Sequence, residues 1–344
     1  MKVLKYILLL LLLMIVAGSI YIATLENNYH VKRTRVIEAP AEVVFDIIND
    51  YKSWPEWSPW LGQDPNATVA YGAKTSGVGA TYSWSGEIIG EGNMETLSVL
   101  EDSISQKITF IKPWESSSNV YWKLNPKKNG TVVTWGMTGE LDFKSKAFMA
   151  FNGGIDKQVG PDYVLGLIKL DSVVNAKMQE YSITVNGVTT HGGGYYLYQS
   201  TSCKMEELPQ KFAEMMPKVI SYVENNNITT AGPPFTIYHT FDSENNAVIM
   251  SVAVPVTERV ITSSDSGILT GFLKPFIAVK TTLKGDYKNS KEAWNTAYKY
   301  IGDNNLEQLE IAPAIEVYLN TPSNTANPAN LRTEIFVPIK EEKP

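Results

Sequence analysis

The second half of the sequence repeats one pattern twice, and this internal repeat limits the possible folds more than any other feature. Each copy reads as a strand, a helix and two further strands; the first covers about residues 192–256 and the second about 275–339. Residues that correspond between the copies are Pro233 and Pro313, Tyr238 and Tyr318, and Pro255 and Pro338. A repeated unit of this kind cannot bury its apolar face alone. We therefore expect two β-α-β-β units to join into one pseudo-symmetric domain with a cleft between its halves.

The residues before the repeat, about 31–176, follow a different order. An alternating stretch over residues 31–39 predicts a strand, and Ala39-Pro40 opens a predicted helix over residues 41–50. A β pattern interrupted by glycines continues to about residue 143. After Gly160-Pro161, a final predicted helix carries an apolar stripe of Tyr163, Leu167, Leu170 and Val174. This order of strand, helix, many antiparallel strands and long helix predicts an α+β domain.

Between the first helix and the β pattern lies Trp54-Pro55-Glu56-Trp57-Ser58-Pro59-Trp60, which has three tryptophans and two prolines in seven residues. The prolines disfavour a regular helix here. Tryptophan is large and highly buried on average, so the loop must cover apolar surface. Two interpretations follow: the loop closes the end of its own core, or it forms the rim of a pocket.

This order of elements, together with EAPAEVVFDIINDYKSWPEWSPW at residues 38–60, resembles the SRPBCC superfamily, also called START-like or polyketide-cyclase-like. The resemblance covers about residues 31–176. It implies the helix-grip fold, in which a curved antiparallel sheet wraps around a long C-terminal helix and encloses a cavity. It also implies that the tryptophan loop lies at one end of that cavity. We therefore expect Trp57 or Trp60 to line the cavity mouth.

The second copy of the repeat, IEVYLNTPSNTANPANLRTEIFVPIK at residues 315–340, resembles the GyrI-like effector-binding domain, a duplicated β-α-β-β fold of the SHS2 type. The resemblance covers about residues 179–340. It implies a site for small, often cationic or drug-like molecules in the cleft between the halves. That family occurs fused to transcriptional regulators and as a stand-alone module. No helix-turn-helix pattern precedes the domain in this sequence, so the resemblance does not carry over a DNA-binding role.

An unbroken apolar run, Tyr6–Ala23, follows Lys2 and Lys5. Its eighteen residues would extend about 27 Å as a helix, enough to cross a bilayer core. A cleaved signal peptide is the alternative, because Ala17-Gly18-Ser19 offers a cleavage site, but the apolar run continues beyond it. We expect an uncleaved membrane anchor within residues 1–24 and soluble domains on the extracytoplasmic side, although basic residues after the run give a mixed positive-inside signal.

Glu316 is the most informative charged residue, because it lies inside an apolar strand with Tyr318 on the same face. A buried carboxylate is costly unless it is paired or hydrogen-bonded, and a cation site is one reason to keep it. Glu334 lies on the other arm of a predicted hairpin, and symmetric pairing about residue 325 would bring the two carboxylates together. The alternative places both glutamates on a solvent-facing side of the sheet.

Aromatic residues supply the rest of a candidate ligand site, since an aromatic face attracts a cation at close range. Tyr196, Tyr238 and Trp294 lie in elements that are predicted to flank the cleft. The alternative for Trp294 is a place in the core between helix and sheet, which its helical spacing favours.

Composition and motifs argue against several classes of function. The net charge is −6 without a basic run in the body of the chain, which argues against a nucleic-acid partner. One cysteine and three scattered histidines argue against a metal site. The sequence contains no nucleophilic triad motif, P-loop or dinucleotide-binding signature, so we expect no cofactor.

The sequence therefore predicts a membrane-anchored protein that binds a small hydrophobic or cationic molecule and is, by default, not an enzyme. Two alternatives stay open. The first is a hydrolase or cyclase that acts on a hydrophobic small molecule through Glu316. The second is a lipid carrier that holds its cargo in the first domain, beside the membrane.

Overall fold

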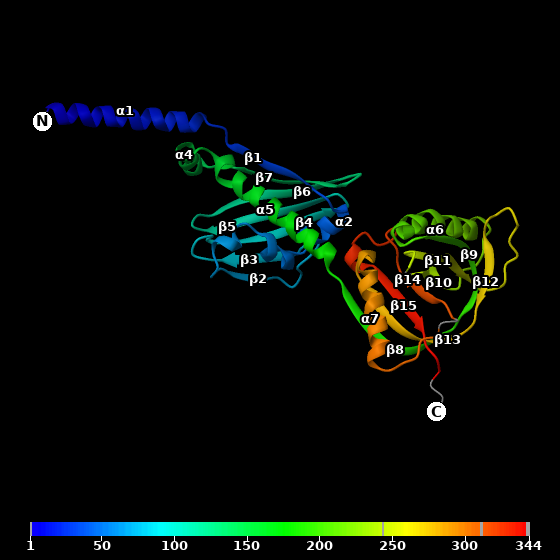
Figure 1. Cartoon of the computed structure of the whole chain (residues 1–344). Coiled ribbons are helices and arrows are strands. Elements are labelled where there is room, and N and C mark those ends of the chain that lie inside the picture. The colour runs from blue at the N-terminus through cyan, green and yellow to red at the C-terminus, as the bar shows by residue number, and fades with distance from the viewer. Residues whose placement is uncertain (1, 243, 310–311, 342–344) are drawn as a thin grey trace. The chain divides into compact units, whose positions relative to one another are not determined.

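The computed structural model describes residues 2–242, 244–309 and 312–341, and the chain divides into two compact units, Met1–Lys177 and Met178–Pro344. Helix α1 (Lys2–Thr24) has the length and apolar composition to cross a membrane, and its apolar side chains are exposed. Figure 1 shows that each unit has its own antiparallel sheet and its own helices.

The first unit is built on a seven-stranded antiparallel sheet in the order β1-β7-β6-β5-β4-β3-β2. Its strands are β1 (Asn28–Ile37), β2 (Thr68–Tyr71), β3 (Thr81–Ser85), β4 (Glu91–Leu100), β5 (Ser103–Lys112), β6 (Ser116–Lys127) and β7 (Gly130–Glu140). The helices that follow α1 are α2 (Ala41–Asn49), α3 (Trp54–Trp57), α4 (Phe143–Asn152) and α5 (Ile155–Gln179). Strand, helix, strands and long helix come in the predicted order, and the α+β class is confirmed.

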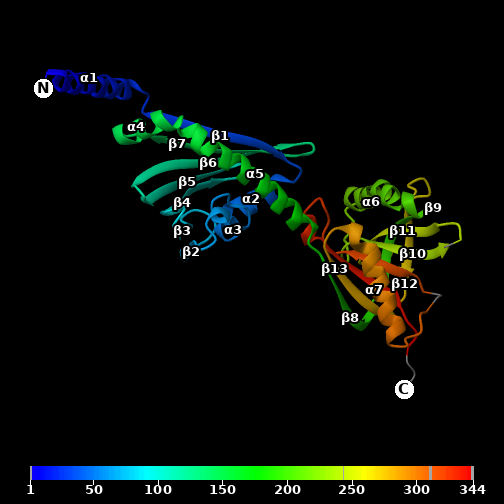
Figure 2. The same cartoon turned by 60° about the vertical axis from the view of Figure 1, so that its left-hand side comes forward.

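Helix α5 lies across one face of this sheet, as both views in Figures 1 and 2 show. The predicted stripe of Tyr163, Leu167, Leu170 and Val174 is buried. It meets aromatic side chains of the sheet: the rings of Trp135 and Tyr163 stack with their centroids 4.0 Å apart. This contact holds the helix on an aromatic core.

Three helices differ from the sequence-based expectation, and one of them, α4, was not predicted. Helix α5 begins at Ile155 and includes Pro161, whereas the sequence predicted a start after that proline. Gly160 before Pro161 and Tyr163 after it are both buried, so α5 is packed on either side of the proline, and the loss of one backbone hydrogen bond does not end the helix. The tryptophan loop also contains one short helix, α3, because Pro55 occupies its first turn, where no backbone N–H is needed.

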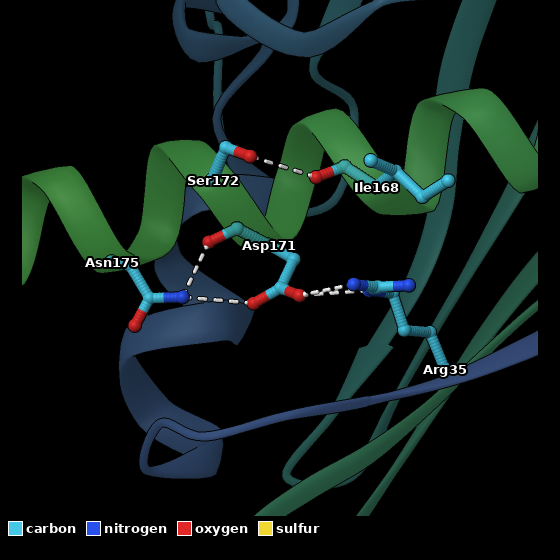
Figure 3. A network of polar contacts seen from close by, with 5 residues as sticks. All are labelled: Arg35, Ile168, Asp171, Ser172 and Asn175. Carbon is cyan, nitrogen blue, oxygen red and sulfur yellow. Dashed lines mark hydrogen bonds and ion pairs between the residues drawn. The ribbon is translucent and has the colours of Figure 1, made fainter.

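Two Arg–Asp ion pairs fasten α5 to the edge strand β1. Arg35 donates from Nε and Nη2 to Oδ2 of Asp171, each at 2.8 Å, and Asn175 donates to Oδ1 of the same carboxylate at 2.8 Å (Figure 3). Arg33 donates to both carboxylate oxygens of Asp156, at 2.8 and 3.0 Å. The two arginines are two residues apart on a strand, so they share one face of β1. Polar contacts with β1 therefore add to the apolar packing that holds α5 on the sheet.

The second unit is built on one eight-stranded antiparallel sheet in the order β12-β9-β11-β10-β14-β15-β13-β8. Its strands are β8 (Ser182–His191), β9 (Gly194–Lys204), β10 (Phe235–Asp242), β11 (Ala247–Val256), β12 (Leu269–Leu273), β13 (Phe276–Lys284), β14 (Ala314–Tyr318) and β15 (Arg332–Pro338). Its helices are α6 (Leu208–Asn225) and α7 (Ser290–Asp303). The order β9-α6-β10-β11 recurs as β13-α7-β14-β15, so the predicted pseudo-symmetric duplication is confirmed.

The outermost strands of this sheet are exchanged between the two halves. Strand β8 precedes the first copy in the sequence but pairs with β13 of the second copy. Strand β12 precedes the second copy but pairs with β9 of the first. The repeat pattern in the sequence included neither strand. Each half thus completes the sheet of the other, and the two halves form one folding unit.

Helices α6 and α7 cover the same face of the sheet. Val219 of α6 packs in a cluster with Tyr238 and Tyr318, and Ala297 of α7 packs in a cluster with Ile335. The opposite face carries a separate apolar cluster that includes Phe235, Ile315 and Phe336. The pairing of β10 with β14 joins the halves at the centre of the sheet. Side chains on the helix-covered face of these two strands therefore lie at the seam of the repeat.

We predict that Arg35→Met lowers the free energy of unfolding of the first unit by about 1 kcal/mol, because the ion pair with Asp171 is partly shielded from water. Arg33→Met is the matched control. Its partner Asp156 is 64% exposed, so that pair should contribute no more than about 0.5 kcal/mol. Urea unfolding of the detergent-solubilised chain, followed by tryptophan fluorescence, measures both, since seven of the eight tryptophans lie in the first unit. Equal losses for the two variants would contradict the prediction.

Candidate functional site

Glu316 lies on β14 at the seam between the two halves of the second unit. It pairs with Thr236 of β10 on one side and with Ile335 of β15 on the other. Paired residues of neighbouring strands point to the same face, and Ile335 packs under α7. Glu316 therefore points toward the helices, and only 4% of its surface is exposed.

Two hydroxyl groups bind the carboxylate of Glu316. Tyr238 donates to Oε2 and Ser290 donates to Oε1, each at 2.8 Å. Ser290 is the first residue of α7, so the carboxylate lies near the positive end of that helix dipole. In the part of the chain that the structure describes, no lysine or arginine forms an ion pair with Glu316. Among the described residues, the carboxyl group is contacted by hydrogen-bond donors and not by a cation.

A chain of aromatic rings connects this carboxylate with the surface. The ring of Tyr238 stacks on Phe241 with centroids 5.3 Å apart and meets Trp294 edge-on, also at 5.3 Å. Trp294 in turn stacks on Tyr298 at 6.0 Å. Phe241 and Tyr298 are exposed, Trp294 is half-buried and Tyr238 is buried. The rings therefore lead from solvent to Glu316.

Tyr318 lies on the same face as Glu316, two residues further along β14. Its hydroxyl forms a 2.9 Å hydrogen bond with Thr236, and its ring contacts Phe212 of α6 and Tyr287. It is buried in this structure. A ligand that reached Glu316 would have to displace side chains that now cover it.

Burial controls the protonation of this cluster. Burial raises the pKa of the Glu316 carboxyl above its ordinary value of 4.5, and hydrogen bonds from Ser290, Tyr238 and Trp294 oppose that shift. The pKa values of Tyr238 and Tyr318 are raised well above 10.0, mainly by burial and then by the nearby Glu316 charge. Both phenols therefore stay protonated near neutral pH, and Tyr238 acts as a donor to the carboxylate.

Glu334 and Tyr196 lie on the opposite face of the sheet. In the hairpin of β14 and β15, Glu316 pairs with Ile335 and Glu334 pairs with Val317. The expected proximity of the two carboxylates is wrong, because the register differs by one residue from symmetric pairing and one residue reverses the face. Glu334 instead forms a 2.7 Å ion pair with Lys280.

The ring of Tyr196 contacts Tyr198 and Phe235, within the apolar cluster on the face away from the helices. Of the residues that the sequence proposed for this site, the structure thus brings together Glu316, Tyr318, Tyr238 and Trp294.

Sequence reasoning missed Ser290, Thr236 and Phe241 as members of the site. Ser290 had one signal, because it begins the stretch predicted to be α7. Three further buried polar atoms near the start of α7 or on the strands beneath it have no hydrogen-bond partner among the described residues; they are Thr281 Oγ1, Asn289 Nδ2 and Thr333 Oγ1. Unpaired buried polar groups are rare in folded proteins, so each of these atoms lacks a partner that a water molecule or a polar ligand group would supply.

The first unit has a cavity of about 240 Å³ between its sheet, α5 and the tryptophan loop. Its lining is aromatic and aliphatic, and it comprises Trp54, Trp60, Leu61, Tyr82, Trp84, Ile89, Met94, Ile108, Phe110, Met137, Val159 and Tyr163. Among these described residues, none carries a carboxylate, an amide or a basic group. The pKa values of Tyr82 and Tyr163 are raised by burial, so both phenols are neutral. The apolar lining of this cavity suits an uncharged apolar molecule.

The two tryptophans proposed for the cavity mouth have different places. Trp60 lines the cavity and donates from Nε1 to Oδ2 of Asp162 at 2.9 Å, which orients its ring. Trp57 is fully buried, and its ring packs edge-on against Trp122 and Trp135. The loop therefore has both roles considered for it, with Trp57 in the core and Trp60 on the pocket wall.

Two family models match the chain. Residues 195–340 match the GyrI-like small molecule binding domain, and residues 37–164 match the family described as polyketide cyclase / dehydrase and lipid transport. Both resemblances seen in the sequence are confirmed by these matches. No curated protein matches the sequence.

Several solved structures are similar to the chain. The C-terminal domain of EcmrR is 15% identical, with 47% of this chain and 98% of that chain covered and a TM-score of 0.40. Protein CV1439 from Chromobacterium violaceum is 14% identical, with 42% and 96% covered and a TM-score of 0.33. SAV2435, solved bound to tetraphenylphosphonium, is 12% identical, with 47% and 94% covered and a TM-score of 0.32.

We predict that Trp57→Ala mainly lowers stability, whereas Trp60→Ala mainly weakens binding. Trp57→Ala should cost about 3–5 kcal/mol of stability, as expected for a fully buried tryptophan. Trp60→Ala should cost less and should weaken binding of a neutral apolar dye such as N-phenylnaphthylamine. Urea unfolding and dye titration of each variant measure the two effects. If Trp60→Ala bound the dye like the wild type, Trp60 would not belong to a binding wall.

Proposed function

We propose that this chain is a membrane-anchored protein that binds a small lipophilic cation at Glu316. The observation that supports the proposal most directly is a buried carboxylate that forms no ion pair with any described lysine or arginine. Burial of an unpaired carboxylate costs several kcal/mol, and a bound cation would offset that cost. The match to a family of small-molecule-binding domains supports the same function.

The rings around Glu316 define the chemistry of the proposed ligand. Tyr238, Trp294 and Phe241 place aromatic surface beside the carboxylate. A delocalised cation gains from the negative charge and from contact with aromatic faces, each contact contributing about 0.5–2 kcal/mol. A compact, strongly hydrated cation would gain less from such a site. The proposed ligand is therefore an aromatic or otherwise lipophilic cation, which enters by displacing Trp294.

A second binding function is proposed for the cavity of the first unit. At about 240 Å³ it is smaller than the pockets of about 300–1,000 Å³ that hold drug-sized ligands. It would accept one small aromatic molecule in this conformation, and a lipid carrier would require the cavity to open. The match to a family that includes lipid transport keeps the carrier function as the alternative for this unit.

An enzyme that uses Glu316 is the alternative for the second unit, and one observation favours it. Burial raises the pKa of the Glu316 carboxyl toward the range in which general acids and bases work. Tyr238 and Ser290 would orient the carboxyl toward a substrate. The test below separates binding from catalysis.

We predict that Glu316→Gln weakens binding of tetraphenylphosphonium about ten- to a hundredfold, because it removes a charge-assisted contact on the order of 1.5–3 kcal/mol. The neutral triphenylphosphine oxide should bind both proteins with similar affinity. Glu334→Gln is the matched control, since its carboxylate lies on the opposite face and pairs with Lys280. Isothermal titration calorimetry of the wild type and both variants, each as the full chain in detergent, measures the affinity for each ligand.

The same titration has a predicted pH dependence. Because the pKa of Glu316 is raised, its carboxylate is protonated at a higher pH than an exposed glutamate, and cation affinity should fall as pH decreases through that pKa. The titratable groups that face it, Tyr238, Tyr287 and Tyr318, stay neutral in this range because burial raises their pKa values. Glu316→Gln should abolish the dependence. Unchanged affinity in Glu316→Gln would remove the site, and turnover of an electrophilic ester by the wild type alone would favour the enzyme.

We also propose that α1 anchors the chain with both units on the extracytoplasmic side. The length and apolar composition of α1 support the anchor, and Lys2 and Lys5 ahead of the apolar run support the orientation. Protease added to intact spheroplasts should degrade both units, and protease added after lysis should act no faster on them. Complete protection in intact spheroplasts would reverse the orientation.

A further inference from the structure

Helix α4 exposes an aromatic face. Phe143 is 50% exposed, Phe148 45% and Phe151 87%. At roughly 100° per residue, these three side chains and Lys144 fall within an arc of about 140° on the helix surface. Exposed clusters of large apolar side chains of this kind mark interaction sites in soluble units.

A second segment adds to this face. Trp114, in the turn between β5 and β6, is 57% exposed, and its ring contacts Phe148 with centroids 5.9 Å apart. The strand register places this turn at the end of the sheet where β1 begins, because β1 starts opposite the end of β7 and β7 ends beside the start of β6. Trp114 and the aromatic face of α4 therefore lie at the end of the first unit that is connected to α1.

The opposite side of α4 is fastened to the end of α1. Lys146 is buried, and its Nζ donates to the carbonyl oxygens of Leu25 at 2.7 Å and Ala23 at 3.4 Å. Figures 1 and 2 both show α4 beside the C-terminal end of α1. α1 ends at Thr24 and β1 begins at Asn28, so the connecting residues span about 10 Å at most. The first unit is therefore held close to the end of the apolar helix.

We propose that the aromatic face of α4, together with Trp114, inserts into the interface of the bilayer that α1 crosses. The inference rests on the proposed membrane anchor. When α1 spans the membrane, its end lies at the interface, and α4, fixed to that end by Lys146, lies at the same depth. Aromatic side chains concentrate at this depth because their amphipathic rings suit the headgroup region.

Charge on α4 agrees with a lipid surface. The helix contains Lys144 and Lys146 and no acidic residue. Lys144 lies on the aromatic face, where its apolar stem can pack beside the rings and its ammonium group can reach anionic headgroups. The proposed partner of this face is thus a bilayer that contains anionic lipid. The face would orient the first unit on the membrane, where α1 alone would leave it free to rotate.

The test places a fluorescent label on this face in the full chain. Cys203→Ser removes the native thiol, and Phe151→Cys or Leu100→Cys provides a single site for an NBD fluorophore. Leu100 is the matched control, because it is also an exposed apolar residue. The start of β4 pairs with the end of β5, next to the turn that holds Trp114, whereas Leu100 ends β4, about 30 Å further along the strand. Both proteins are reconstituted into vesicles of phosphatidylcholine and phosphatidylglycerol that contain lipids with a doxyl quencher close to the headgroup.

Quenching at position 151 should be several-fold stronger than at position 100. Carbonate extraction of the same vesicles reports on the anchor separately. If the protein stays in the vesicles after carbonate extraction and quenching is equal at both positions, the inference is overturned and the anchor stands. If carbonate releases the protein but quenching at position 151 is strong, the proposed anchor is overturned and the lipid-binding face stands. A label shielded in native membranes but exposed to water in lipid-only vesicles would overturn the inference in favour of a protein partner.

Discussion

The second unit depends on the pairing of β10 with β14, because this pairing turns two copies of one motif into a single sheet. It sets Thr236 opposite Glu316 and places Tyr238 and Tyr318 on the same face. The exchanged edge strands β8 and β12 then connect each half to the other, so the seam cannot open without loss of the outer pairs as well. A site at the seam therefore draws residues from both halves and keeps its geometry only while the sheet is whole.

The Glu316 carboxylate imposes a cost on this otherwise apolar seam. An acid whose pKa is raised by folding contributes stability that is present at low pH, below its unfolded pKa, and that is lost as pH rises through the folded pKa. The ionised form of the group thus works against folding, and the hydroxyls of Tyr238 and Ser290 reduce that penalty. A hydrophobic residue at this position would pack more favourably. The cation ligand proposed for this site would offset the cost of a glutamate here.

The sequence predicted those parts of the structure that local patterns determine. Helical stripes and strand alternation predicted α5, α7 and the repeated order of elements, and the strand period predicted that Glu316 and Tyr318 share a face. Pairing between distant segments was not available from such patterns. Glu334 was misplaced because a register one residue away from symmetric pairing reverses its face.

The strands β8 and β12 were missed for a related reason: their partners lie in the other copy. The separation of Trp57 from Trp60 likewise depended on the short helix α3, which begins at Trp54 and ends before Pro59. Local chemistry permitted that turn, but the surrounding aromatic core decided which indole faced the cavity.

The anchor and the proposed ligand chemistry have a common physical basis. A lipophilic cation partitions into a bilayer, especially one with anionic headgroups, so its concentration beside the membrane exceeds that in bulk water. A binding protein tethered there meets the higher concentration, much as a linked module meets a raised effective concentration of its partner. A site that must first displace Trp294, and therefore binds less tightly than an open one, gains most from this arrangement. Under the proposed function, a ligand that reaches the protein through the membrane surface would account for both the buried carboxylate at Glu316 and the apolar α1.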